Sequence, residues 1–362
     1  MAAINLHNEV YKTGKYPVFL GEQLGIFDSV NVTYPEMHKL YKLQKAQDWD
    51  ENEVNLDQTR KDFVACSKNN YDVMIKNLSF QWENDSLAKS IITLFSPFLS
   101  NNEACAMMMK QSEMEVLHAL TYSEIIRQCT PDPIEVINQI MINDKIFNRM
   151  GIIADIMGQL EEAGHKYALG LIEANDELRL LILKGMVALI GLEGIQFISS
   201  FSATFAMAEQ QLFVGACKLI QKIMLDEILH VKMDYAVIDA LMHDPIWRKI
   251  YEDNIEELTL ILDTVVEQEE QWCDYLFSEG RFIVGLNAEL SKQWVYFNAA
   301  PIYRRLKMKA KFKAPKHSPL AWMEKWLNPD LIQSAAQEIQ LTNYKLNSAN
   351  KDLSDDEELD FE

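Results

Sequence analysis

The sequence predicts an all-α protein built as one helical bundle, on three observations. Apolar residues recur with a period near 3.6 from about residue 57 to about residue 330. Turn formers are scarce, with 13 Gly and 10 Pro in 362 residues, which argues against a turn-rich β fold. The periodic stretch is punctuated by turn signals at CTPDP (129–133) and MHDP (242–245). We therefore expect one domain over residues 1–330.

The helices are expected in order wherever the 3.6 periodicity continues without a break. A short helix near residues 35–46 ends before Trp49. Seven longer helices are then expected at 57–92, 101–128, 133–145, 148–172, 177–207, 209–240 and 246–278. Residues 331–362 end in SANKDLSDDEELDFE, which is polar and acidic, so a flexible tail that is disordered when free is expected there.

The composition excludes several classes of function. The formal net charge of -20 repels nucleic-acid phosphates and anionic membrane surfaces, so neither is an expected partner. The five cysteines are odd in number, far apart and never in a CxxC pair, which is typical of a reducing, cytoplasmic setting. The first residues, MAAINLHNEVYKTGKY, lack the features of a secretion signal. A soluble cytoplasmic protein is the expectation.

One stretch resembles a membrane span, and its single charge points to a different interpretation. Residues 185–208 are almost wholly apolar and contain one charged residue, Glu193. A lone carboxylate inside an apolar helix is costly unless it is neutralised, hydrogen-bonded or bound to a cation. Glu193 therefore needs a partner.

Two Glu-x-x-His tetrads, at 115–118 and 227–230, lie within strong helical patterns. Residues i and i+3 share a helix face, so a carboxylate and an imidazole can reach one metal ion, and this donor pair suits iron or manganese. Chance alone predicts roughly 0.6 such tetrads in a chain of this kind. A third tetrad, at 162–165, is interpreted as an exposed helix end with ordinary solvated roles.

A fuller pattern raises the first two tetrads above chance. Paired iron sites in helical bundles use one carboxylate from each of two helices and Glu-x-x-His from two others. Glu193 lies one helix before Glu227, and Asp85 lies one helix before Glu115, with Glu83 as the rival to Asp85. The predicted metal ligands are Asp85, Glu115, His118, Glu193, Glu227 and His230.

Tyr122 follows His118 by four residues and so projects from the same helix face. It is either an ordinary core tyrosine or a phenol that an oxidising metal pair converts to a radical. Phe197, Phe201 and Ile223 lie on the ligand-bearing faces, where they are plain core or a wall that excludes water from the tyrosine.

Four segments together carry a resemblance that spans nearly the whole chain: NLSFQWENDS, EVLHALTYSEII, GLEGIQFISSFSATFAMAE and LDEILH. The chain resembles the small (beta) subunit of class I ribonucleotide reductase. The resemblance implies a ferritin-like bundle with a dimetal carboxylate site, in which Tyr122 holds a stable radical. It assigns Asp85, Glu115 and His118 to one metal and Glu193, Glu227 and His230 to the other, with Glu115 and Glu227 able to bridge.

The same resemblance assigns roles that spacing does not. Asp226 matches the carboxylate that accepts a hydrogen bond from the metal-bound His118. Trp49 matches the tryptophan that begins the path carrying the radical out of the subunit. Tyr344 matches a relay tyrosine, and Glu338 resembles an interfacial acid. A homodimer and a large (alpha) subunit that binds the acidic tail are the implied partners. Leu225 departs from relatives that have arginine there, and the tail ends in Leu-Asp-Phe-Glu, so which large subunit it fits is open.

The implied activity is oxidative. Two iron ions, or two manganese ions or a mixture, would activate dioxygen and oxidise Tyr122. The oxidising equivalent would then pass through Asp226, Trp49 and Tyr344 to the large subunit, where ribonucleotides are reduced to deoxyribonucleotides. No GxxxxGK or GxGxxG motif is present, which agrees with substrate binding elsewhere.

The alternative functions are a ferritin-like oxidase or monooxygenase with its own small substrate, metal storage, and a helical scaffold. A basic run, 303–317, is a solvated face or a contact for an acidic partner.

Overall fold

The computed structural model describes residues 5, 7–14, 16–141 and 144–328. Within these ranges every named element is helical, and the only β pairing is two isolated bridges, so the predicted all-α class is confirmed. The elements are η1 (Val10–Thr13), α1 (Pro35–Ala46), α2 (Asp57–Ala65), α3 (Lys68–Leu94), η2 (Ser96–Phe98), α4 (Asn102–Cys129), α5 (Pro133–Met141), α6 (Asp144–Ala168), α7 (Asp176–Gly191), η3 (Leu192–Phe197), α8 (Ile198–Ala208), α9 (Val214–His243), α10 (Pro245–Asp253), α11 (Ile255–Leu276), α12 (Ala288–Arg305) and η4 (Ala321–Lys325).

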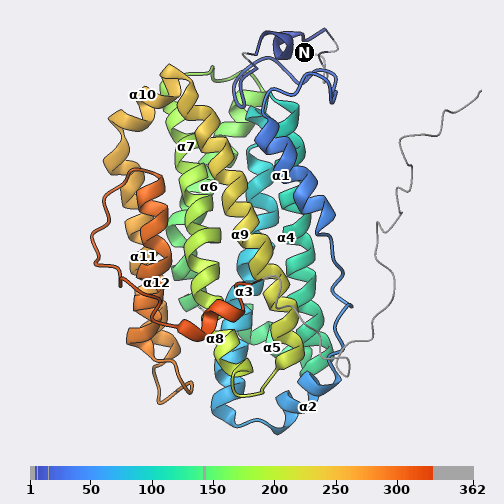
Figure 1. Ribbon diagram of the computed structural model, residues 1–362, viewed down its shortest axis with the longest axis vertical. Coiled ribbons are helices and arrows are strands. Elements are labelled where there is room, and N and C mark those ends of the chain that lie inside the picture. The colour runs from blue at the N-terminus through green and yellow to red at the C-terminus, as the bar shows by residue number, and fades with distance from the viewer. Residues whose placement is uncertain (1–4, 6, 15, 142–143, 329–362) are drawn as a thin grey trace, which may run out of the picture.

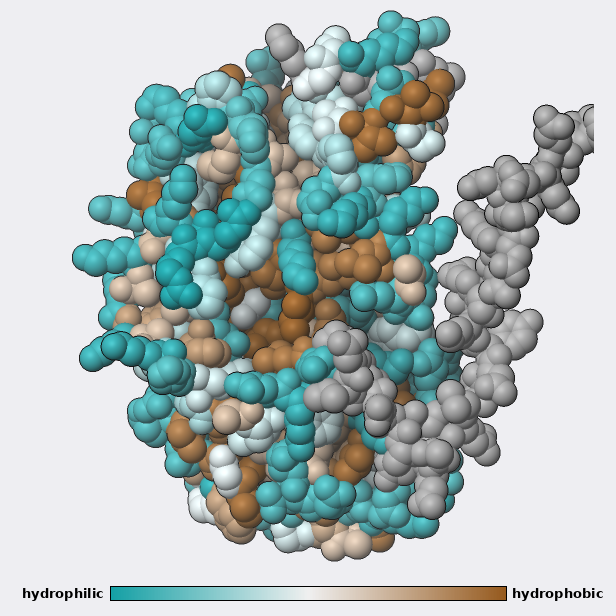
Figure 2. All heavy atoms as spheres, in the orientation of Figure 1, coloured by the Kyte–Doolittle hydropathy of each residue, from teal (hydrophilic) through white to brown (hydrophobic). Residues whose placement is uncertain are grey.

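The long helices lie side by side with their axes roughly parallel, and the segment before α1 covers one end of the bundle (Figure 1). Helix α4 packs against α3, α1 and α9, while α7 packs against α6, α9 and α11. Hydrophilic residues cover most of the face in Figure 2, and apolar residues gather near its centre. The bundle thereby brings α3, α4, η3 and α9 around one interior.

Several predicted helices are shorter or divided, and tertiary contacts explain the differences. The expected helix 57–92 is divided because Cys66 is extended, and α2 is tied instead to the start of α9, where Asp62 accepts a hydrogen bond from the Phe213 amide at 2.9 Å. Helix α9 begins later than expected because Gln211 and Phe213 have positive φ angles of 59° and 56°. The expected helix 246–278 is divided at Asn254.

The apolar stretch around Glu193 forms one helical rod from Asp176 to Ala208. Among the described residues it is the one helix long and apolar enough to cross a membrane, yet 89% of its most apolar window is buried inside the fold, as in the core helix of a bundle. Its middle part, η3, has π-helical hydrogen bonding. Such π segments interrupt α-helices frequently at functional sites. Here the segment carries Glu193.

A buried ion pair links α6 to α11 next to this rod. The Arg149 guanidinium donates two hydrogen bonds to Glu269, one of them from Nη2 to Oε2 at 2.5 Å, and both side chains are fully buried. The guanidinium carbon of Arg149 lies 3.2 Å from the centroid of the Phe80 ring and 4.5 Å from that of the Trp272 ring. Burial raises the pKa of Glu269 and Arg149 opposes that rise. Each of the two buried charges is therefore compensated only while the other side chain is present.

Removing one member of this pair should strongly destabilise the fold. We expect Glu269→Ala to lower the free energy of unfolding by about 3 to 5 kcal/mol, because it leaves the Arg149 charge buried without its counter-ion. The double variant Arg149→Met/Glu269→Leu should lose much less. Urea unfolding followed by circular dichroism measures both, and Glu162→Ala, which breaks the exposed pair with Lys166, is the matched control. Equal losses in Glu269→Ala and Glu162→Ala would contradict this account.

Candidate metal centre

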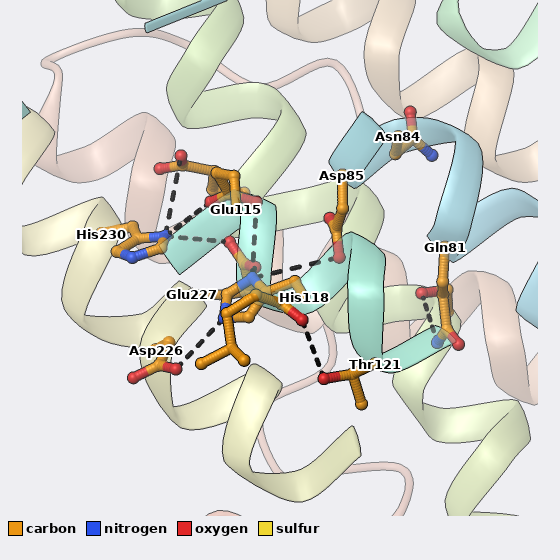
Figure 3. Close-up of polar contacts among 12 residues, drawn as sticks. Gln81, Asn84, Asp85, Glu115, His118, Thr121, Asp226, Glu227 and His230 are labelled. Atoms are coloured by element: carbon orange, nitrogen blue, oxygen red, sulfur yellow. Dashed lines mark hydrogen bonds and ion pairs between the residues drawn. The ribbon is translucent and has the colours of Figure 1, made fainter. Parts of the chain in front are cut away.

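Six buried donor side chains converge from four helical segments, and Figure 3 labels five of them. They are Asp85 from α3, Glu115 and His118 from α4, Glu193 from η3, and Glu227 and His230 from α9. Their donor atoms form two overlapping groups, each within 4.8 Å: Asp85, Glu115, His118 and Glu227 in one, and Glu115, Glu193, Glu227 and His230 in the other. Two carboxylates therefore belong to both groups.

The distances show how these two carboxylates span the site. The Glu115 oxygens lie 3.4 Å from His118 Nδ1 and 2.9 Å from His230 Nδ1. The Glu227 oxygens lie 3.1 Å from His118 Nδ1 and 3.4 Å from His230 Nδ1. Each carboxylate thus directs one oxygen to each histidine, which is the arrangement of a bridging ligand. Asp85 and Glu193 each lie 4.0 Å from one histidine only, as terminal ligands do.

The donor set fits two divalent cations. Both oxygens of Asp85, Glu115 and Glu227, together with His118 Nδ1 and His230 Nδ1, are buried without a hydrogen-bond partner among the described residues. Buried carboxylates in this state are costly unless a cation compensates them. Four carboxylates balance the charge of two divalent ions, and oxygen with imidazole donors suits iron or manganese.

The pKa values follow from the crowding of carboxylates. Burial and then the Glu115 carboxylate raise the pKa of Asp85 well above its usual range. Burial would also raise the pKa of Glu115, but His118 and His230 outweigh it and lower that pKa to about 2. Burial would lower the pKa of His230, yet Glu115 and Glu227 raise it to about 10. Without metal, protons on the imidazoles therefore supply positive charge to the site.

Glu83, the rival first ligand, lies elsewhere. It belongs to neither donor group, although it is only two residues from Asp85 on α3. Two residues along a helix turn a side chain by about 200°, so the two carboxylates leave opposite sides of α3. Burial raises the pKa of Glu83 to about 7. The structure thus brings Asp85, and not Glu83, to the other five donors.

Tyr122 lies on α4 in the fully buried interior. Burial, followed by the nearby carboxylate of Asp85, raises the pKa of its phenol well above 10, so the hydroxyl keeps its proton at neutral pH. Phe197, Phe201 and Ile223 are also completely buried, and the two phenylalanine rings stack with centroids 6.1 Å apart. The Tyr122 side chain itself has no exposed surface, so water is excluded from the phenol.

Asp226 connects the donor cluster to Trp49. Its Oδ2 accepts a hydrogen bond from Trp49 Nε1 at 2.7 Å and lies 3.1 Å from His118 Nε2, while its Oδ1 accepts one from Gln44 Nε2 at 2.8 Å. The Trp49 and His118 rings stack with centroids 6.1 Å apart. Burial would raise the pKa of Asp226, but the hydrogen bonds from His118 and Trp49 help to lower it, so it stays a carboxylate. These contacts connect His118 through Asp226 to Trp49.

Comparison with known proteins agrees with this geometry. The sequence matches the model of the family "Ribonucleotide reductase, small chain" over residues 26–319. The chain belongs to this family. It is 27% identical over 363 residues to the ribonucleoside-diphosphate reductase 1 subunit beta of Salmonella typhimurium, covering 96% of both chains. It is 24% identical over 366 residues to the ribonucleoside-diphosphate reductase subunit beta of Enterobacteria phage T4, covering 94% of both.

Solved structures share the fold of this ribonucleotide reductase small chain. The R2 subunit from Clostridium botulinum superposes with a TM-score of 0.75 at 20% identity, covering 86% of this chain and 94% of that one. The dimanganese(II)-NrdF of Streptococcus sanguinis superposes with a TM-score of 0.67 at 18% identity, covering 84% and 99%. The ferritin-like class predicted from sequence is therefore confirmed. Members of the family are dimetal proteins that use iron or manganese, which suits the buried donor groups here.

Three polar residues of the small subunit's site were not singled out from the sequence. Gln44, on the buried face of α1, bonds Asp226 as described above. Gln111 Nε2 donates to Glu193 Oε1 at 2.8 Å. Asp234 is a hydrogen-bond neighbour of Glu193, and burial raises its pKa to about 7. Helical spacing could have indicated two of these three residues, because Gln111 precedes Glu115 by four residues and Asp234 follows His230 by four, so each shares a helix face with a donor.

Some predicted features lie away from the site or outside the described residues. The third tetrad is exposed near the end of α6, where Glu162 pairs with Lys166 at 2.6 Å, as its interpretation required. Tyr344, Glu338 and the acidic tail fall within residues 329–362, outside the described ranges, so the tail and the domain boundary at residue 330 remain predictions.

Proposed function

We propose that this chain is the radical-generating small subunit of a ribonucleoside-diphosphate reductase, with a dimetal centre held by Asp85, Glu115, His118, Glu193, Glu227 and His230. The observation that carries the proposal is a fully buried tyrosine, Tyr122, placed beside a cage of four carboxylates and two imidazoles. Two iron ions are the proposed metals, and the same donors accept two manganese ions or a mixture. With dioxygen, the bound metals supply the one-electron oxidation of the phenol.

The protein contributes position and insulation. Glu115 and Glu227, which belong to both donor groups, would hold the two metal ions close together, and the turn of α4 that carries His118 places Tyr122 one turn further along. The complete burial of Tyr122 keeps water from the phenol, which would lengthen the life of a neutral radical there, and we propose that the buried Phe197 and Phe201 form part of this wall.

The proposed route out of the subunit begins at Asp226 and Trp49 and continues to Tyr344. The hydrogen bond from Trp49 to Asp226, and the contact of Asp226 with His118, support its first part. Small subunits of the family act with a large subunit and form homodimers. We propose further that residues 331–362 dock on the large subunit here and that the chain works in the cytoplasm.

Reconstitution with defined metals tests the proposal. The protein is loaded with Fe(II) or Mn(II) and exposed to oxygen. It should bind two metal ions per chain and show a tyrosyl radical by electron paramagnetic resonance. It should reduce a ribonucleoside diphosphate only when the large subunit is added. Turnover of a small substrate without the large subunit would favour the alternative, a ferritin-like oxidase or monooxygenase. Two bound metals with no radical and no partner-dependent activity would exclude the radical assignment.

Trp49→Phe should separate radical formation from radical export. The variant removes the indole N–H that bonds Asp226, so we expect the Tyr122 radical signal to persist. Reductase activity with the large subunit should fall by about a hundredfold or more, equivalent to about 2.7 kcal/mol in the barrier. The matched control is Trp247→Phe, because Trp247 is also buried but packs against Phe19, on no proposed path. Activity of Trp49→Phe close to that of Trp247→Phe would rule the path out.

A further inference from the structure

The basic run noted in the sequence is part of a longer segment without acidic residues. No Asp or Glu occurs from residue 290 to residue 323, although the chain has 54 acidic residues and a formal net charge of -20. Within that segment, residues 304–316 contain seven Lys or Arg. A local excess of positive charge in so acidic a chain is an attraction site for anions.

The backbone arranges four of these cations in a row. Helix α12 ends at Arg305, and Lys307 has a φ of 56°, which turns the chain out of the helix. The Met308 amide then donates to the Tyr303 carbonyl at 2.8 Å, and the following residues run as a loop along the outside of α11 and α12 (Figure 1). The segment is anchored where Phe312 packs on two tyrosine rings, with centroid distances of 4.9 Å to Tyr296 and 5.4 Å to Tyr303.

Residues alternate between inside and outside along this loop. Met308 is buried, and Ala310, Phe312 and Ala314 are half-buried, so the intervening lysines all face solvent. These four, Lys307, Lys309, Lys311 and Lys313, are named here the lysine ridge. Of the four, Lys311 alone has an ion-pair partner within the described part of the chain, namely Asp263 at 2.8 Å. Three ridge lysines are thus available to an anionic partner.

The chain's own terminus carries the complementary pattern. Asp356, Glu358, Asp360 and Glu362 alternate with the same period of two. Alternate side chains of an extended segment lie on one side, spaced by about 6.6 Å, so four carboxylates would match four ammonium groups. Leu359 and Phe361 would then face away from the ridge.

Tethering favours this terminus over an anion arriving from solution. The net charge of -20 repels free polyanions, whereas the terminus is held near the ridge by covalent connection. The 27 residues from 329 to 355 can span up to roughly 90 Å, which exceeds the distance to any part of a bundle of this size. The effective concentration of a flexibly linked segment is of millimolar order. Weak surface ion pairs can act under that condition.

We propose that residues 356–362 dock on the lysine ridge of the same chain when no large subunit is bound. The large subunit must then displace the docked terminus, so the ridge reduces the fraction of chains that are competent to bind it. The docking itself stands independently of the proposed function, which enters only by naming the competitor.

Zero-length carbodiimide crosslinking of the full-length chain, at low concentration and read by mass spectrometry, tests the docking. Carboxylates of residues 356–362 should join mainly to the four ridge lysines, Lys307, Lys309, Lys311 and Lys313. In the variant Lys307→Gln/Lys309→Gln/Lys313→Gln, the yield at the remaining Lys311 should fall by about fivefold or more. The same fall is expected in 1 M salt, where the screening length is about 3 Å.

The matched control removes three exposed lysines elsewhere, Lys42→Gln/Lys45→Gln/Lys61→Gln, and should leave the ridge crosslinks unchanged. Crosslinks spread evenly over Lys42, Lys45, Lys61 and the ridge, or yields that survive in the ridge variant, would overturn the docking.

A binding measurement with the large subunit tests the competition. The ridge variant should bind it a few times more tightly than the unmodified chain, because more termini are free. Weaker binding by the ridge variant would show that the ridge is itself a contact for the large subunit, and would overturn the competition. Absence of any binding by the unmodified chain would contradict the proposed function, while the crosslinks would still decide the docking.

Discussion

Tyr122→Phe will abolish the radical signal and the reductase activity of the metal-loaded protein while leaving its metal content unchanged. The phenylalanine ring fills the same buried space and all six donors remain, with Asp85 losing only the neighbouring hydroxyl. A phenyl ring has no O–H to lose, so no neutral oxygen radical can form. Electron paramagnetic resonance after oxygen exposure, metal analysis and assay with the large subunit are the three measurements.

The matched control for this variant is Tyr251→Phe. Tyr251 is also buried, and its hydroxyl donates to the Leu306 carbonyl at 2.7 Å, away from the donor cluster. This variant should keep both the radical and the activity, with a stability loss of about 1 kcal/mol from the lost hydrogen bond. If the Tyr122→Phe protein retained its radical signal, the radical would have to be assigned to another residue.

The second large effect concerns the histidines. His118→Ala and His230→Ala should each lower the bound metal by about one ion per chain, because each imidazole serves one of the two donor groups. The unmodified chain, at metal concentrations about a hundred times the dissociation constant, should gain about 2.7 kcal/mol of stability for each bound ion, seen as a rise of several degrees in Tm. The variants should lose much of that rise.

The third Glu-x-x-His tetrad provides the control. His165→Ala changes the same residue type at the same spacing from a glutamate, but His165 is exposed on α6. Metal content and the metal-induced rise in Tm should therefore match the unmodified chain. If His165→Ala and His118→Ala bind equal amounts of metal, the assignment of the buried cluster as the metal centre is wrong.

Much of the fold could be predicted because helical periodicity is local. The ranges 35–46, 101–128 and 148–172 agree with α1, α4 and α6 to within a few residues. The sequence did not predict the breaks at Cys66 and Asn254 or the late start of α9. These features depend on partners far away in the chain, such as Asp62, which accepts a hydrogen bond from the Phe213 amide. The periodicity around Glu193 predicts an ordinary helix and does not indicate its π-helical turn.

Five of the six donors could be predicted from the sequence. The i, i+3 spacing of a Glu-x-x-His tetrad places two candidate ligands on one helix face, and an isolated Glu193 in an apolar helix has to be neutralised, hydrogen-bonded or bound to a cation. Those are properties of the sequence itself. Only the tertiary structure decided between Asp85 and Glu83, since both lie on α3 and the packing of α3 against α4 selects which of them turns inward. Gln44 and the pair of Arg149 with Glu269 were likewise settled by contacts between helices, because their hydrogen bonds across the core join residues that no local spacing relates.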